Sequence, residues 1–211
     1  MTKFNKDDSN NEIKFIRDKP QEDIPSLTKL MKKNQMTNIL DHGCGAGRNT
    51  VYLAKHGLDV SGLDISDLCL RDTEKWLKTE GLHADLKKAD FFKKLPYSDK
   101  SFDAVINIRA LSHNTENLIK KAIIEIHRVL KQGGFFFLQT AKMADGVQNS
   151  GPIKLKKLTN NTYLQLNGYQ KGTIHYSFSE ESIEEMFKNF KILDIHTDKT
   201  QRLYSILAQK L

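Results

Sequence analysis

An acidic residue and three glycines at alternate positions form the most chemically informative segment of the chain. In order these residues are Asp41, Gly43, Gly45 and Gly47, and a short apolar run over residues 37–40 precedes them. Alternate glycines let the backbone turn sharply and approach a ligand closely, because no Cβ intervenes. A helix that begins just after them directs unpaired N–H groups at that ligand. The dinucleotide-binding fingerprint has its third glycine one residue later, so this spacing predicts a nucleotide-like ligand without a pyrophosphate.

A second acidic residue follows the next predicted strand, where a nucleotide-binding fold needs a carboxylate. Residues 58–63 read as a strand that ends at Asp64. A carboxylate at the tip of the second strand can accept hydrogen bonds from both hydroxyls of a ribose. The alternative interpretation of Asp64 is a plain surface-turn acid.

These residues and three later segments resemble the class I S-adenosylmethionine-dependent methyltransferases, especially the small members that act on small molecules. The matching segments, in family order, are residues 40–48, 63–66, 88–91, 101–106 and 125–134. They run from about residue 37 to residue 140, which is about half of the chain. The sequence departs from the family at His42, where an apolar residue is usual, so side chains beneath the loop are expected to be arranged differently.

The resemblance implies S-adenosyl-L-methionine as the cofactor and assigns a set of residues to it. That set is Asp41, Gly43, Cys44, Gly45, Gly47, Asp64, Ile65, Asp90, Phe91 and Asn107. Asp41 would support the loop or reach the ammonium group through water, and Asp64 would hold the ribose. Ile65 would contact the adenine, Asp90 would accept from its amino group, and Phe91 would flank the ring. The competing interpretations are a tight turn for the glycines and a turn acid for Asp90.

The family resemblance also implies transfer of a methyl group to an acceptor, but the residues that act on the acceptor are harder to recognise in the sequence. Methyl transfer from a sulfonium is an in-line displacement whose leaving group needs no proton, so positioning supplies much of the rate and no catalytic triad is expected. His113 follows the expected fourth strand, residues 102–106, and has a family position often occupied by histidine. It is the candidate general base, with a structural hydrogen-bonding histidine as the alternative. His175 and Tyr176 are weaker candidates.

Two other acceptor chemistries are disfavoured by motifs that the chain lacks. The Asn/Asp-Pro-Pro-aromatic motif, which holds a planar amine, does not follow the fourth strand. Methylation of an adenine amino group is therefore disfavoured. Neither Cys44 nor Cys69 has the Pro-Cys pattern of the cytosine-C5 enzymes.

Alternating strand and helix patterns predict an α/β fold. Combined with the resemblance, they give a three-layer Rossmann-like sandwich with a seven-stranded, mostly parallel sheet and an antiparallel last strand. One helix is expected over residues 115–131, ended by Gly133 and Gly134, and a later one is capped by Ser179 with Phe190 on its buried face. Residues 191–196 and 202–208 are the closing strands.

The expected domain organisation is simple. Residues 1–36 form an N-terminal polar tail and cap helices, and residues 37–211 form the methyltransferase domain. Within it, residues 141–178 are too long for an ordinary loop; they are predicted to be a substrate-cover insertion that contains a hairpin. A hairpin without a function is the alternative.

Composition narrows the class of protein. The 211 residues carry a formal net charge of +7, but the lysines are scattered among acids, so nucleic-acid binding is disfavoured. No membrane span and no signal peptide are expected, and the two cysteines form no metal or disulfide pattern. These features favour a cytoplasmic enzyme, monomeric or homodimeric, that binds no metal and methylates O, N or S of a small-molecule acceptor. The alternatives are an RNA or protein methyltransferase and a cofactor-binding module that transfers nothing.

Overall fold

The central element of the fold is a mostly parallel sheet. The computed structural model describes residues 19–142, 153–168 and 170–211; the predicted tail and the first cap-helix residues, 1–18, lie outside this range. Seven strands pair in the order β3-β2-β1-β4-β5-β10-β9. Their bounds are β1 (Asn38–His42), β2 (Asp59–Asp64), β3 (Asp85–Lys88), β4 (Phe102–Ile108), β5 (Leu130–Ala141), β9 (Phe190–Thr197) and β10 (Leu203–Lys210). The first five strands in this order, β3, β2, β1, β4 and β5, are parallel to one another. Strand β10, the last in the chain, is antiparallel to both β5 and β9, as predicted.

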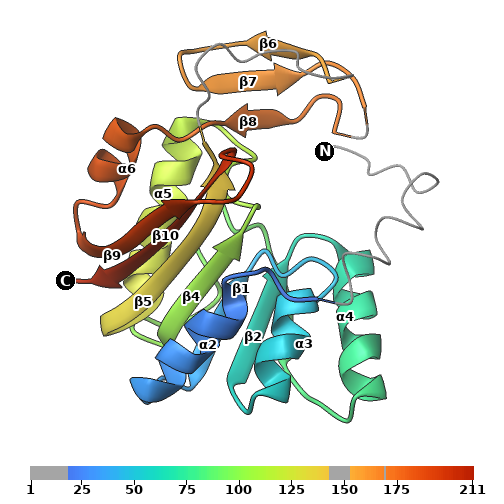
Figure 1. Cartoon of the computed structure of the whole chain (residues 1–211). Coiled ribbons are helices and arrows are strands. Elements are labelled where there is room, and N and C mark those ends of the chain that lie inside the picture. The colour runs from blue at the N-terminus through green and yellow to red at the C-terminus, as the bar shows by residue number, and fades with distance from the viewer. Residues whose placement is uncertain (1–18, 143–152, 169) are drawn as a thin grey trace.

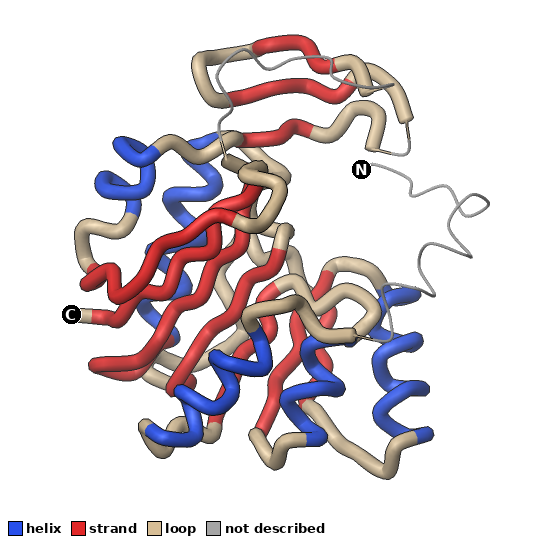
Figure 2. The backbone as a smooth tube through the Cα atoms, viewed as in Figure 1, coloured by secondary structure: helices blue, strands red, loops and turns tan. Residues whose placement is uncertain are grey.

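Helices cover both faces of this sheet (Figure 2). On one face lie α2 (Ile24–Lys33), α3 (Arg48–Lys55) and α4 (Asp67–Thr79), and on the other lie α5 (Glu116–Val129) and α6 (Glu180–Met186). Successive strand residues point to opposite faces. Accordingly, Ile39 joins the apolar cluster beneath α2 and α3, whereas the next residue, Leu40, joins the cluster beneath α5 and α6. The sandwich therefore has three layers, and both faces of its central strands are buried.

The end of α5 differs from the expectation. The helix stops at Val129, and Leu130 is already extended, with ψ of 140°, as the first residue of β5. Gly133 and Gly134 lie inside β5, where the register with β4 shifts. Gly133 has φ of +73°, and a Cβ on Gly134 would lie 2.9 Å from the Asp103 carbonyl oxygen. The glycines thus serve an irregular strand start and not the helix end.

The Ser179 cap is confirmed, but the helix after it is shorter than expected. Ser179 Oγ accepts a hydrogen bond from the Ser182 backbone N–H at 3.2 Å. Helix α6 ends at Met186, so Phe190 begins β9. Phe190 is nevertheless buried, with its ring centroid 5.6 Å from that of Phe187.

A small second sheet lies above the carboxyl ends of β4 and β5 (Figure 1). It contains β6 (Leu155–Lys157), β7 (Thr162–Gln165) and β8 (Ile174–Tyr176), all antiparallel. The predicted hairpin is therefore present as β7 and β8, with a third strand beside it. A backbone hydrogen bond joins Tyr176 N of β8 to Ser112 O in the turn after β4 at 2.7 Å, and just past β8 another joins Phe178 N to Ala141 O of β5 at 2.9 Å.

Candidate active site

The glycine loop joins β1 to α3 at the carboxyl edge of the sheet. All three of its glycines have positive φ, at +86° for Gly43, +54° for Gly45 and +87° for Gly47. A Cβ on Gly43 would lie 2.7 Å from Ala110 Cβ, and one on Gly47 would lie 2.5 Å from Thr73 Cγ2. A Cβ on Gly45 would meet nothing within 4 Å. The outer glycines thus allow close contacts with neighbouring elements, whereas Gly45 faces open space.

Asp64 ties this loop to the tip of β2. Its Oδ2 accepts from the Gly45 backbone N–H at 2.9 Å, and its Oδ1 accepts from the Ser66 backbone N–H at 2.9 Å. Each carboxylate oxygen keeps a further lone pair. The next side chain, Ile65, is 57 % exposed. Asp64, the residue predicted to hold the ribose, is therefore bonded to the middle of the glycine loop and has lone pairs available for hydroxyl donors, and the exposed Ile65 follows it.

Asp41 is buried beneath the loop. Its Oδ2 accepts from Thr50 Oγ1 at 2.7 Å, and the residue is 1 % exposed. Burial raises the pKa of its carboxyl to about 6, although the Thr50 hydrogen bond opposes the shift. This side chain supports the loop from below and does not reach solvent.

Two other residues assigned to the cofactor have buried side chains. A Cβ on Gly62 of β2 would lie 3.2 Å from the Cys44 sulfur, so the thiol faces the sheet. Burial raises the pKa of the Cys44 thiol. Asn107 Oδ1 accepts from the Leu111 backbone N–H at 2.9 Å, and Asn107 is fully buried. The side chains of Cys44 and Asn107 therefore support neighbouring loops from within the fold.

His42 is buried next to Asn107, and its tautomer follows from the hydrogen bonds. Asn107 Nδ2 donates to the His42 backbone oxygen at 2.7 Å and approaches His42 Nδ1 at 2.8 Å. Because the amide nitrogen is the donor, Nδ1 accepts and the proton of the neutral ring is on Nε2. Nε2 has no hydrogen-bond partner among the described residues. Burial lowers the pKa of His42 to about 3, so the ring is neutral.

The segment after β3 brings two further predicted residues to the loop. Asp90 Oδ1 accepts from the Phe92 backbone N–H at 3.0 Å, which fixes a turn. The Phe91 ring lies 4.6 Å from the His42 ring, and a Cβ on Gly43 would lie 3.3 Å from Phe91 Cε1. Asp90 and Phe91 thus lie at the same edge as the glycine loop.

His113 follows β4 and lies at the junction with the small sheet. Its ring is 5.1 Å from that of His175 on β8, in an edge-to-face arrangement. Burial, and then the charges of His175 and Arg109, lower the pKa of His113 to about 4. His175 Nε2 is buried without a hydrogen-bond partner among the described residues, and burial lowers its pKa as well. Both imidazoles are neutral near pH 7.

Two arginines at this edge were missed by the sequence interpretation. Arg48 is the first residue of α3 and is partly buried, and Arg109 is the first residue after β4. The positive charge of Arg109 lowers the pKa of Arg48, after burial, the larger cause. The sequence did offer a signal for both arginines, because Arg48 directly follows the last glycine of the loop and Arg109 directly follows a buried strand.

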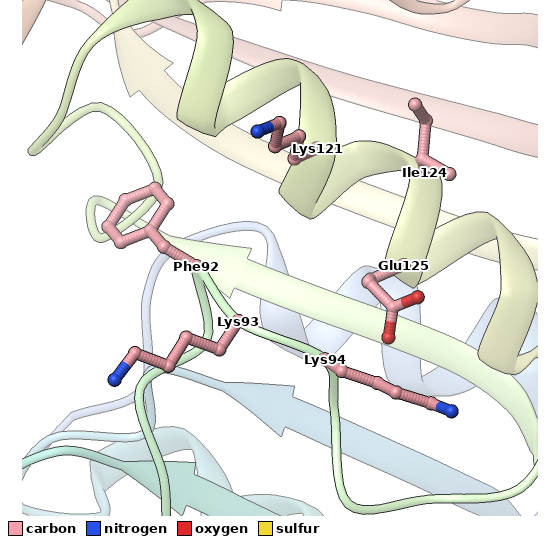
Figure 3. A pocket seen from close by; sticks show the side chains of 6 residues that line it. All are labelled: Phe92, Lys93, Lys94, Lys121, Ile124 and Glu125. Carbon is pink, nitrogen blue, oxygen red and sulfur yellow. The ribbon is translucent and has the colours of Figure 1, made fainter.

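A hollow of about 300 Å³ lies elsewhere, between α5 and the segment that follows β3 (Figure 3). Its lining is Phe92, Lys93, Lys94, Lys121, Ile124 and Glu125. Glu125 is engaged by Arg128 at 2.8 Å and by the Leu95 backbone N–H at 2.9 Å. None of the residues assigned to the cofactor or to catalysis lines this hollow.

The carboxyl edge of a parallel sheet, a glycine loop after β1 and an acid at the tip of β2 together define a nucleotide-binding α/β domain. Residues 39–134 match a family model described as a methyltransferase domain. Over this part, slightly less than half of the chain, the sequence is similar to the class I S-adenosylmethionine-dependent methyltransferases. The prediction of S-adenosyl-L-methionine as cofactor is confirmed at the level of this family.

Curated relatives match over the same part of the chain. The S-adenosyl-L-methionine-dependent Diels-Alderase of Talaromyces variabilis is 34% identical over 105 residues, which are 48% of this chain and 35% of that protein. The sarcosine/dimethylglycine N-methyltransferase of Aphanothece halophytica is 33% identical over 117 residues, 53% of this chain and 42% of that protein. The chain therefore spans less than half the length of these two relatives.

Solved structures share the fold over nearly all of the chain. The PH0226 protein from Pyrococcus horikoshii OT3 superposes with a TM-score of 0.76 at 21% identity, covering 100% of this chain and 94% of that one. The magnesium protoporphyrin IX methyltransferase from Synechocystis PCC 6803, with bound S-adenosylhomocysteine, gives a TM-score of 0.70 at 17% identity, covering 99% and 91%.

Two further observations concern the described residues alone. No helix among them is both long and apolar enough to cross a bilayer. No group of three or more histidine, cysteine, aspartate or glutamate side chains among them could hold a metal ion.

Proposed function

We propose that this chain transfers a methyl group from S-adenosylmethionine to O, N or S of a small-molecule acceptor. The observation that carries the proposal is the open side of the glycine loop, where Gly45 faces free space and Asp64 and Ile65 flank it. When bound, the cofactor supplies an electrophilic methyl group on a sulfonium. Held by Asp64 and Ile65 beside the glycine loop, it would supply this methyl group to the acceptor's lone pair, and its sulfur would keep the electron pair of the broken carbon–sulfur bond.

The chain's contribution to this reaction is binding and orientation. The free lone pairs of Asp64 would accept from ribose hydroxyls, and Ile65 would supply an apolar surface for the adenine. His113 would act on the acceptor, and the lowered pKa makes it a neutral imidazole, the form in which it can take a proton. The small sheet of β6, β7 and β8 lies over the ends of β4 and β5, where it would exclude water from the acceptor.

Cofactor binding is the first test. Calorimetry with S-adenosylhomocysteine should show micromolar-range affinity, and NAD should not bind. Asp64→Ala should weaken binding by about 1–3 kcal/mol, the usual range for a lost charged partner. Asp59→Ala is the matched control, because Asp59 is exposed at the opposite end of the same strand. Equal affinities of wild type and Asp64→Ala would remove Asp64 from the ribose site.

Methyl transfer is a separate test, because one relative carries a Diels-Alderase name and a solved structure of this fold is titled a [4+2]-cyclase. Radiolabelled S-adenosylmethionine would be incubated with the protein and four acceptor pools: amino acids and their N-methyl derivatives, phenols and thiols, total RNA, and a mixture of proteins. Sarcosine belongs in the first pool, since one relative is named for it. Label in small molecules supports the proposal. Label only in RNA or protein favours the alternative enzyme, and binding without transfer favours a non-catalytic module.

A further inference from the structure

The segment that forms the small sheet has an unusual charge composition. Between Asp145 and Glu180 the chain has no acidic residue, and this is the longest such stretch in the sequence. The stretch has no arginine either, so its charge at pH 7 comes from four lysines. Elsewhere the lysines are scattered among acids. The small sheet is therefore a part of the chain in which positive charge is not offset by nearby residues in the sequence.

The fold does not neutralise these lysines. All four are exposed: Lys154, Lys156, Lys157 and Lys171. None of them forms an ion pair among the described residues. Lysines of the large sheet do pair, and Lys131 Nζ, for example, lies 2.7 Å from Asp103 Oδ1. The small sheet thus presents its positive charge to the surroundings of the molecule.

Most of this charge lies along one edge strand. The strand order is β6-β7-β8, and β8 is the strand that contacts the turn after β4, so β6 lies farthest from the large sheet (Figure 1). Lys156 and Lys157 are adjacent in β6, and successive strand residues project from opposite faces. Positive charge therefore lies on both faces of the sheet along β6.

Large aliphatic side chains are exposed at both ends of the same strand. Ile153 lies just before β6 and Leu158 just after it, and each is 45 % exposed. Leu166 is 43 % exposed, and its backbone N–H donates to Lys154 O at 2.8 Å, which places it beside the start of β6. One exposed aliphatic residue needs no explanation. Three of them around a short lysine-rich strand form an amphipathic edge.

We propose that this outer edge, residues 153–158 together with Leu166, docks on the surface of an anionic lipid bilayer. Lysines beside such a surface are attracted to its negative lipids, and aliphatic side chains enter the boundary between headgroups and acyl chains. The charges lie on both faces of a thin sheet. A fluid bilayer can surround such an edge from both faces, whereas a folded protein would cover one of them.

Nucleic acid is the other common polyanion, and the outer edge lacks the groups that bind it best. Arginine forks bind phosphates, and aromatic side chains stack on bases. No arginine is present here. Tyr163 on β7 is only partly exposed, and its hydroxyl donates to Asn160 O at 3.3 Å. The exposed side chains are aliphatic, so they suit acyl chains and not the faces of bases.

Co-sedimentation with lipid vesicles tests the contribution of charge. Wild type should sediment with vesicles of equal parts phosphatidylglycerol and phosphatidylcholine, should not sediment with phosphatidylcholine alone, and should bind less as salt is added. The triple variant Lys154→Gln, Lys156→Gln and Lys157→Gln should bind the mixed vesicles about tenfold or more weakly. Absence of wild-type binding to the mixed vesicles would overturn the proposal.

A second triple variant controls for net charge. Lys29→Gln, Lys32→Gln and Lys33→Gln remove three exposed charges from α2, away from the small sheet. This control should change vesicle binding less than about twofold. If both triple variants lost affinity equally, the overall charge of the protein would account for binding, and the outer edge would have no special role. Circular dichroism and melting curves would show that both variants fold.

Tryptophan fluorescence tests insertion of the aliphatic side chains. The natural tryptophan, Trp76, is the only one in the chain, so Trp76→Phe gives a silent background. In that background, emission from Leu158→Trp should shift to shorter wavelength when the mixed vesicles are added. Leu193→Trp is the matched control, because Leu193 on β9 is 41 % exposed, and it should not shift. Vesicle binding without a shift in Leu158→Trp would contradict docking through this edge.

Competition distinguishes the bilayer from nucleic acid. Single-stranded RNA added to the vesicle-bound protein should not release it. Release by RNA would assign the lysines to nucleic acid and overturn the proposal. S-adenosylhomocysteine binding would be measured on the same samples, because docking goes beyond the proposed function. Loss of docking with intact S-adenosylhomocysteine affinity would reject this inference alone, and absence of S-adenosylhomocysteine binding would reject the proposed function.

Discussion

The side-chain amide of Asn107 bonds to both the imidazole and the backbone of His42, through Nδ2 at 2.8 Å to Nδ1 and at 2.7 Å to the carbonyl oxygen. Through Oδ1 the same amide accepts from the Leu111 backbone N–H at 2.9 Å. One buried side chain therefore joins the end of β1, the end of β4 and the turn that follows β4. These are the elements on which the proposed cofactor and acceptor sites depend.

This relationship predicts a contrast between two variants. Asn107→Ala removes three hydrogen bonds and leaves buried partners unpaired, so it should lower the free energy of unfolding by about 2–4 kcal/mol. His42→Leu keeps the bond from Asn107 to the backbone. It leaves one buried Nδ2–H of Asn107 without its acceptor, which costs stability, but it also removes the unpartnered Nε2–H, which offsets that cost. It should change stability by less than about 1 kcal/mol at pH 8. Urea unfolding followed by circular dichroism measures both, and a loss in His42→Leu as large as in Asn107→Ala would contradict the assignment.

The same His42→Leu variant should change the response to acid. Burial lowers the pKa of His42 to about 3, below the ordinary value of 6.5. The folded state thus resists protonation, and the stabilising contribution present above pH 6.5 is lost as the pH falls toward 3. Relative to wild type, the variant should gain about 1.4 kcal/mol for each pH unit below 6.5. Unfolding curves at pH 8, 7, 6 and 5 that stay parallel would show that the imidazole is not buried as described.

Asp41 should have the opposite dependence on pH. Burial raises its pKa from 3.8 to about 6, so the folded state favours the protonated form. The associated stability is fully present below pH 3.8 and is lost as the pH rises through 6. Asp41→Asn, which can still accept from Thr50, should be more stable than wild type at pH 8, by at most about 3 kcal/mol. The gain should vanish near pH 4; Asp59→Asn, at an exposed site, is the control, and a gain independent of pH would contradict this account.

The features that could be predicted from the sequence are those that depend on residues close together in the chain. The glycine spacing, the acid at the tip of β2 and the Ser179 cap involve residues near one another in the chain, and each has a physical signature. The 3.6-residue apolar pattern also placed α5 but extended it too far, because Leu130 is buried in a strand as it would be in a helix. Burial alone does not distinguish the two.

Contacts between residues far apart in the chain could not be predicted from local sequence patterns. His42 and Asn107 are 65 positions apart, and the close approach of Gly43 to Ala110 depends on two strands being neighbours. The same applies to the effect of the Arg109 charge on the pKa of Arg48, because the two residues follow different strands of the sheet. Asn107 and Cys44 were assigned to the cofactor from family position, whereas their burial could be known only from the fold.

Two glycine variants should separate folding from binding. Gly47→Ala forces a Cβ to within 2.5 Å of Thr73, at φ of +87°, and Thr73 Oγ1 also bonds to Gly45 O at 3.1 Å. It should lower stability by about 2–4 kcal/mol. Gly45→Ala has φ of +54° and open space around its Cβ, so it should lower stability by only about 1 kcal/mol. Because that Cβ occupies the proposed ligand space, Gly45→Ala should weaken S-adenosylhomocysteine at least tenfold; equal effects of the two variants on both properties would contradict the division.

The role of His113 is the last prediction, and it needs an acceptor from the labelling experiment. Burial and the nearby charges lower the pKa of His113 to about 4, so it is already neutral from pH 6 to 8. If it acts as general base, turnover should stay level over that range and decline only near pH 4. His113→Ala should lower turnover by about a hundredfold, at the lower end of the usual contribution of a general base, with S-adenosylhomocysteine affinity changed less than twofold.

The neighbouring imidazole supplies the control for His113. His175→Ala removes the ring 5.1 Å from His113 but leaves the β4 turn intact. If His175 only packs against His113, its removal should raise the pKa seen in the acid limb toward 6.5 and change the plateau rate little, because the site becomes wetter and one imidazole is lost. Unchanged turnover in His113→Ala would assign catalysis to proximity alone. An acid limb near 6.5 in wild type would show that the titrating base is a different, exposed group.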